Sequence, residues 1–176
     1  ETTLYAAGCR HGPFNPVFLT SLNGGDNWSI QVLHAGVGFA YALAYCESDP
    51  AILYAGGYSD DSARVFRSSD YGLSFTEVSS PLWPEGDYVN CLAVDPTDPD
   101  IVLAGNESGI YRTANGGAVW TQVSARPDIY SIGCSSIDPV IALACHDDGA
   151  MRSFDGGLTW QDCSDGLYSC WFFPVM

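Results

Sequence analysis

The sequence contains no lysine, and its six arginines face 21 Asp and Glu residues, which gives a formal net charge of −15. Phosphate binding needs a basic face, so neither nucleic acid nor an anionic membrane is an expected partner. Long apolar runs are also missing. The longest, residues 33–46, is interrupted by His34, glycines and tyrosines, and is too short for a membrane helix. We therefore expect no membrane insertion and interpret the acidity as a solvated surface.

Metal-binding spacings are equally scarce. His11, His34 and His146 are scattered, and the sequence has no CxxC pair, so no zinc site is predicted. Acidic segments 60–61 and 95–100 offer oxygen ligands for Ca²⁺ but lack the spacing of a calcium loop. The sequence predicts no metal and no cofactor.

Seven cysteines favour an oxidising compartment, and hence an extracellular or secreted protein. Cys134 and Cys145 are equally distant from the turn at residues 139–140. An antiparallel hairpin would place them opposite each other, with Cα atoms about 4.5 to 5.5 Å apart, within disulfide range. It is an equally good interpretation that the two cysteines are unpaired and their thiols fill part of a core.

An eight-residue pattern, called the octet below, occurs four times. Its first position is Ser or Thr, its third is Asp or Asn, its fifth is Gly, and its eighth is an aromatic residue. The Asp or Asn side chain can bind nearby backbone N–H groups, and Gly permits a positive φ, so each octet predicts a turn between two strands. The sixteen positions are Ser21, Asn23, Gly25, Trp28, Ser68, Asp70, Gly72, Phe75, Thr113, Asn115, Gly117, Trp120, Ser153, Asp155, Gly157 and Trp160.

The octet resembles the Asp-box, or bacterial neuraminidase repeat, S-x-D-x-G-x-T-W. The resemblance implies that each octet lies between the third and fourth strands of a β-propeller blade. That family includes sialidases, other glycosidases, sorting receptors and photosystem assembly factors, and its boxes usually lie away from the ligand site. It therefore implies a fold and says little about chemistry.

The flanking residues supply four strands per unit. Residues 4–8 match a second strand, so the first unit lacks a first strand, whereas residues 166–173 match the start of one. The predicted fold is all-β: a single domain over residues 1–176, built as a small propeller of four blades of four antiparallel strands. Its first blade is completed by the C-terminal strand.

The predicted C-terminal strand carries Trp171, Phe172 and Phe173, so neither of its faces consists of small side chains. It is therefore also a candidate subunit contact, which would complete the first blade of another copy and build a homo-oligomer or fibre. Closure within one chain is the favoured alternative.

No catalytic residues are predicted. Arg67, Arg112 and Arg152 occupy the same place before successive octets and are interpreted as surface ion pairs, not as a sialidase arginine triad. Acidic residues that offer a glycosidase pair occur mostly in turns, where backbone chemistry alone favours Asp. They are Glu47, Asp49, Asp60, Asp61, Asp147 and Asp148.

Three further residues are candidate surface sites. Trp83 occurs in a proline-rich inserted loop and is predicted to be an exposed aromatic on which a sugar stacks. Asn27 and Asn106 begin glycosylation sequons, and Asn106 is the better candidate because it follows a strand.

The favoured function is a non-enzymatic extracellular scaffold or binding module that associates with itself or with cell-surface material and has a glycan or protein ligand. The alternative is a fragment of a sialidase-like or other glycoside hydrolase propeller, or a carbohydrate-binding propeller.

Overall fold

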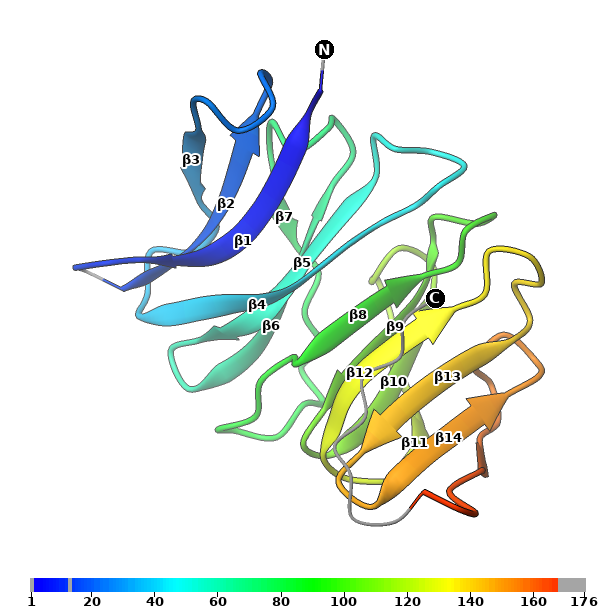
Figure 1. The fold of residues 1–176 in the computed structure, drawn as a ribbon. Coiled ribbons are helices and arrows are strands. Elements are labelled where there is room, and N and C mark those ends of the chain that lie inside the picture. The colour runs from blue at the N-terminus through cyan, green and yellow to red at the C-terminus, as the bar shows by residue number, and fades with distance from the viewer. Residues whose placement is uncertain (1, 13, 168–176) are drawn as a thin grey trace.

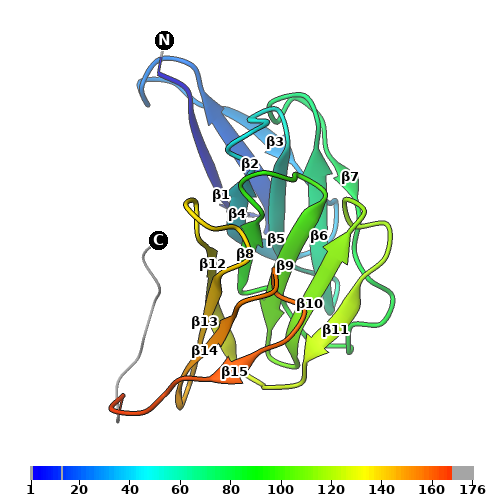
Figure 2. The ribbon, with the colours of Figure 1, turned by 90° about the vertical axis from the view of Figure 1, so that its right-hand side faces the viewer.

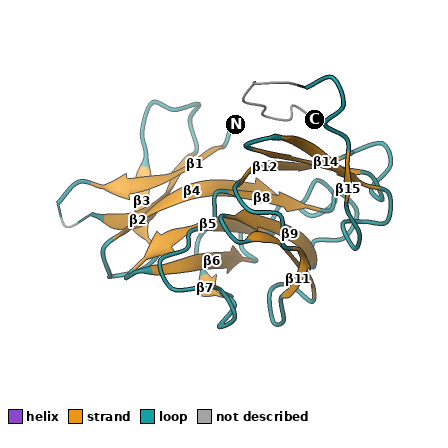
Figure 3. Cartoon of the chain, turned by 90° about the horizontal axis from the view of Figure 1, so that it is seen from below, coloured by secondary structure: helices purple, strands orange, loops and turns teal. Residues whose placement is uncertain are grey.

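The protein, described by a computed structural model over residues 2–12 and 14–167, contains fifteen strands and no helix in that range (Figures 1 and 3). The strands form four antiparallel sheets that follow one another through the molecule in chain order (Figure 1). This confirms the all-β propeller prediction. The described part of the chain accordingly has no helix that could cross a membrane.

Each sheet is a meander of sequential strands. The first sheet contains β1 (Leu4–Arg10), β2 (Asn15–Ser21) and β3 (Ser29–Val32), and the second contains β4 (Gly38–Tyr45), β5 (Leu53–Ser59), β6 (Ser62–Ser68) and β7 (Thr76–Glu77). The third contains β8 (Cys91–Val94), β9 (Ile101–Asn106), β10 (Gly109–Ala114) and β11 (Thr121–Ser124), and the fourth β12 (Ile129–Cys134), β13 (Ala142–His146), β14 (Gly149–Ser153) and β15 (Gln161–Asp162).

The first sheet has three described strands, and β1 pairs directly with β2, with Leu4 opposite Ser21. The prediction that the chain begins at a second strand is therefore confirmed. The strand expected to complete this sheet, with Trp171, Phe172 and Phe173, lies outside the described residues. Both closure within the chain and exchange between copies stay predictions.

Local chemistry explains the short connections within the sheets. Ser59 pairs with Ser62, so β5 and β6 are joined by the two residues Asp60 and Asp61, which have φ of 49° and 58°. Positive φ at both central residues is the conformation that two-residue hairpins favour, and Asp tolerates it better than most side chains. Tyr, Val and Ile in the strands suit a pleated, packed surface, and the frequent Ala allows close packing between sheets.

The core lies between the sheets, because each middle strand is covered on both faces. One apolar cluster joins the second and third sheets and includes Tyr54, Val65 and Trp120. Another joins the third and fourth sheets and includes Leu103 and Ile129. Each such large side chain contributes about 1.5 to 3 kcal/mol when fully buried, so burial between sheets holds the sheets in their order around the molecule (Figure 2).

Candidate functional site

The four octets share one hydrogen-bond pattern. Ser68 Oγ donates to Asp70 Oδ1 at 2.8 Å and accepts the Gly72 N–H at 2.9 Å, while Asp70 Oδ1 accepts the Ser74 N–H at 2.9 Å. Equivalent bonds occur in the other three octets. The leading hydroxyl residue of every octet is buried. These hydroxyls and carboxylates are therefore committed to the turn and are not free for catalysis.

The eighth residue of the octet joins neighbouring sheets. Phe75 packs against Phe18 of the first sheet, with ring centroids 4.7 Å apart. Trp120 donates its indole N–H to the Val78 carbonyl oxygen of the second sheet. Trp28, in the first octet, is 41% exposed. Phe75 and Trp120 are thus packing groups between sheets. Trp160 instead donates its indole N–H to the Gly157 carbonyl oxygen of its own octet at 3.1 Å.

The three arginines before the octets do not gather into one site. Arg67 forms an ion pair with Asp100 at 3.3 Å, Arg112 Nε donates to the Gly156 carbonyl oxygen at 2.8 Å, and Arg152 lies over the Phe154 ring. Arg67 and Arg112 both reach the sheet that follows their own. The expected ion pair is present at Arg67, and at Arg112 a backbone carbonyl takes its place.

Trp83 is not an exposed aromatic: only 8% of its surface is accessible, and its ring packs against Tyr111 and Trp120. Asn106 is also buried, at 1% exposure, as the last residue of β9, and its Oδ1 accepts the Ser108 N–H. Trp83 does lie between strands, but the third sheet covers it, and Asn106 still belongs to β9 instead of to the turn that follows. Asn27 is exposed, and its glycosylation stays a prediction.

The predicted register of the two cysteines is wrong as well. Cys134 pairs with Ala142, and Cys145 pairs with Ser131, so they are not opposite each other. The hairpin turn is centred at Asp138 instead of at residues 139–140, which shifts the pairing. Both thiols are free, and burial raises the pKa of each.

A row of tyrosines and carboxylates spans three sheets. The first strands of these sheets, β4, β8 and β12, lie side by side (Figure 1). Tyr58 donates to Asp61 Oδ1 at 3.3 Å, and Tyr88 donates to Glu107 Oε1. In the fourth sheet the pKa of Tyr130 is raised by loss of solvent and then by a hydrogen bond to Asp147. We call these three pairs the tyrosine–carboxylate row.

Neighbouring members of the row lie close enough to influence one another. The hydrogen bond to Glu107, followed by desolvation, raises the pKa of Tyr88 to about 12, and the charges of Tyr130 and Tyr41 add to the rise. Tyr41 is 55% exposed, and its ring lies 5.9 Å from both Phe39 and Tyr88. The row therefore presents exposed aromatic faces beside carboxylates.

Sequence reasoning missed this row, although the signal was present. Each carboxylate belongs to the turn between the second and third strands of its sheet. Glu107 and Asp147 occupy the same place in their turns, directly after the paired residues Asn106 and His146. Asp61 and Asp147 were interpreted as turn chemistry, and Glu107 was not considered. Asp60 does bind a backbone N–H, but it is that of Val37, 23 positions away.

The chemistry of the row suits a hydroxyl-rich ligand. Aromatic faces pack on the apolar face of a sugar ring, and ionised carboxylates only accept hydrogen bonds, as hydroxyl donors require. Among residues 2–12 and 14–167, no group of three or more His, Cys, Asp and Glu side chains is placed to hold a metal ion.

No protein-family model matches the sequence. One similar curated protein is a xyloglucanase from a Paenibacillus species, which is 30% identical over 150 residues. The match covers 66% of this chain but only 14% of the xyloglucanase, so the chain spans a small part of its relative.

Solved structures show the same fold at low identity. An ancestral GH74 enzyme matches with a TM-score of 0.65 and 19% identity over 82% of this chain and 21% of its own. The GH74 enzyme of Niastella koreensis matches with a TM-score of 0.65 and 15% identity over 92% of this chain and 24% of its own. YCF48 bound to D1 peptide matches with a TM-score of 0.58 and 16% identity over 72% of this chain and 41% of its own. These likenesses establish a β-propeller fold.

The comparisons overturn the favoured functional prediction. A non-enzymatic, self-associating scaffold was expected because no catalytic constellation is visible in the sequence. The xyloglucanase and the GH74 structures are enzymes, and the chain covers only a fraction of each. Since the chain covers so little of these enzymes, a missing constellation in it is no argument against an enzyme.

Proposed function

We propose that the chain is a four-sheet section of a glycoside hydrolase propeller that acts on xyloglucan or a related neutral glucan. The observation that carries this proposal is the 30% identity to the Paenibacillus xyloglucanase. Because only 14% of that relative is covered, the activity and substrate of a whole enzyme belong to the proposal.

Within this function, the tyrosine–carboxylate row is the surface that receives the glucan chain. Phe39 and Tyr41 are nearly parallel, at 11°, and both are exposed, which suits stacking against sugar rings. Asp61, Glu107 and Asp147 would accept hydrogen bonds from sugar hydroxyls. We assign the row to binding and assign no residue of it to bond cleavage.

The proposal includes two finer points. The four octets are Asp-boxes of the bacterial neuraminidase type, supported by their shared hydrogen bonds and buried hydroxyls. The protein acts outside the cell, because a polysaccharide substrate does not cross a membrane.

The test is retention of the protein in native gels that contain xyloglucan, together with release of reducing ends from the same polymer. Tyr41→Ala should weaken retention about 5- to 10-fold, since one stacking contact is lost. Phe154→Ala, which removes another exposed aromatic away from the row, is the matched control. Absence of both retention and hydrolysis on xyloglucan and other neutral glucans would contradict the proposal.

A further inference from the structure

The first sheet departs from the repeat at the position before its octet. The other three sheets have arginine there, and the first has Thr20. Thr20 pairs with Tyr5 as Arg67 pairs with Tyr54. In the second sheet, Arg67 Nε donates to the Tyr54 hydroxyl oxygen at 3.0 Å, and its guanidinium occupies the space toward the third sheet. The space that faces Thr20 has no such occupant.

A second departure faces the same space from the other side. The fourth octet position is glycine in three octets and Tyr71 in the second. All four have positive φ, with Tyr71 at 60° and Gly116 at 66°. A residue with a bulky side chain seldom adopts this backbone conformation, because it destabilises the folded state. A Cβ on Gly116 would lie 2.8 Å from Asp100 Oδ1 and 3.2 Å from Arg67 Nε. Beside Tyr71 the equivalent residues are the smaller Ala51 and Thr20, which leave room for a side chain.

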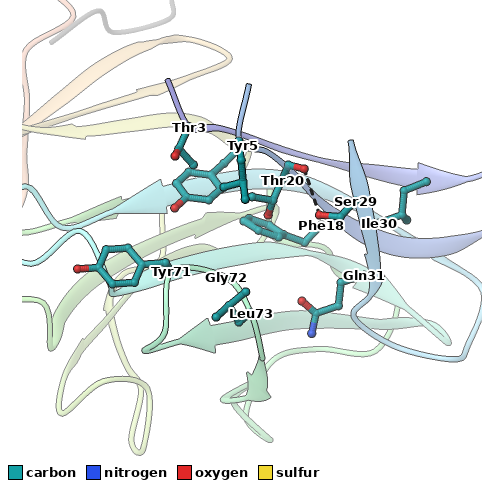
Figure 4. Close-up of a pocket in the computed structure, with 11 residues that line it drawn as sticks. Thr3, Tyr5, Phe18, Thr20, Ser29, Ile30, Gln31, Tyr71, Gly72 and Leu73 are labelled. Carbon is teal, nitrogen blue, oxygen red and sulfur yellow. Dashed lines mark hydrogen bonds between the residues drawn. The ribbon is translucent and has the colours of Figure 1, made fainter. Parts of the chain in front are cut away.

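The two departures line one cavity of about 590 Å³ between the first sheet and the octet of the second (Figure 4). This volume lies in the range of small-ligand pockets, about 300 to 1,000 Å³. Phe18 lies at the buried end, 5.5 Å from the Tyr5 ring, whereas Tyr71 is 57% exposed. Gln31 adds an amide group.

The lining chemistry selects an uncharged ligand. None of the cavity's described lining residues carries a charge, although the whole chain has a net charge of −15. Within the described residues, the side-chain polar groups of Tyr5, Thr20, Gln31 and Tyr71 have no hydrogen-bond partner. The site therefore combines aromatic faces with free neutral donors and acceptors, which an ionic ligand would leave without a counter-charge.

The cavity continues along the first sheet. A shallower depression of about 350 Å³ shares Thr20 and Ser29 with it and ends at the exposed indole of Trp28. A ligand of more than one ring would lie along both.

We propose that this cavity binds a neutral oligosaccharide, with a pyranose ring between Tyr5 and Tyr71 and its hydroxyls bound by Thr20 and Gln31. The site is separate from the tyrosine–carboxylate row, because β6 runs from the Asp61 turn at one end to the Tyr71 octet at the other. It therefore goes beyond the proposed function: it is a second binding site, whichever reaction the whole protein performs.

The competing explanation is that Tyr71 only fills room left by the missing arginine. Variants that restore the repeat separate the two. Tyr71→Gly removes one aromatic wall and relieves the positive φ. Thr20→Arg narrows the cavity and brings in a charge, as Arg67 does in the equivalent groove of about 470 Å³. Both should keep the fold, with an unfolding midpoint for Tyr71→Gly unchanged or raised, yet both should lose at least tenfold in affinity for the oligosaccharide.

The measurement is an amide-shift NMR titration with cellotetraose and a xyloglucan heptasaccharide, with tetragalacturonate as the charged comparison. We expect shifts at Thr20, Gln31 and Gly72 with both neutral ligands, lost in the two variants and retained in Phe154→Ala. No shifts at these residues, equal shifts with the charged ligand, or wild-type affinity in Tyr71→Gly would overturn the proposal. Shifts at Tyr41 and Tyr88 report the row separately, so failure of one site is distinguishable from failure of the other.

Discussion

Trp120 donates its indole N–H to the carbonyl oxygen of Val78 at 2.8 Å, across the boundary between the second and third sheets. The same indole packs against Trp83, with ring centroids 5.4 Å apart, and is only 3% exposed. A residue that the repeat pattern marks as part of a turn is therefore a principal contact between sheets.

Replacing Trp120 tests this role. Trp120→Ala should lower the free energy of unfolding by about 3 to 5 kcal/mol, because a large buried side chain and its hydrogen bond are both lost. Urea denaturation followed by tryptophan fluorescence measures the loss. Trp28→Ala, at the equivalent but exposed octet position, should cost less than about 1 kcal/mol. Equal losses in the two variants would contradict the assignment.

Adjacent glycines in the fourth octet give a second comparison. Gly157 has φ of 82°, and a Cβ there would lie 2.5 Å from Leu103 Cδ2. Gly156 has φ of 69° and nothing within 4 Å. Both alanine variants lose about 1 to 2 kcal/mol to the backbone conformation, and Gly157→Ala should lose about 1 to 3 kcal/mol more through overpacking. The difference in denaturation midpoints at equal slope measures the steric part.

The loss of folding stability at acidic pH should depend in part on Asp155. Hydrogen bonds from Thr159, and then from Ser153, lower the pKa of this carboxyl from 3.8 to about 2. The folded state therefore holds the proton less tightly than the unfolded state, so this contribution is present above pH 3.8 and is lost as the pH falls toward 2. Asp155→Asn should reduce the loss of stability over that interval. Asn115 occupies the same octet position, so the fold should tolerate the change.

The loss of folding stability at alkaline pH should depend in part on Tyr88. Its pKa is raised from 10.0 to about 12, so the folded state keeps a proton that the unfolded state releases. The resulting contribution is fully present below pH 10 and is lost as the pH rises toward 12. Tyr88→Phe should flatten stability over this interval in urea denaturation at stepped pH.

The fold was predictable because the octet chemistry is local. Each turn needs one hydroxyl, one Asp or Asn and one Gly within five residues, and Ser153, Asp155 and Gly157 make the expected bonds. Spacing between octets and the strands beside them then predicted four sheets. These arguments needed no contact between distant residues, whereas completion of the first sheet by residues 166–173 does need one and stays a prediction.

Predictions that depended on distant contacts were less successful. Trp83 belongs to a loop by composition, and only the docking of the third sheet buries it. The Tyr88 and Glu107 pair joins residues 19 positions apart, and the row appears only when three sheets are side by side. The favoured functional prediction was wrong for a different reason: it rested on the absence of a catalytic constellation, and the octet side chains, which are bound within their turns, indicate nothing about chemistry.

Inter-sheet packing follows chain order: β1 contacts β4, β4 contacts β8, and β8 contacts β12. During synthesis, each new sheet can therefore dock on the sheet that precedes it in the sequence, which has already been synthesised. Across the fifteen described strands, assembly can therefore proceed by addition of one sheet at a time, with short loop closures and no pairing between remote segments.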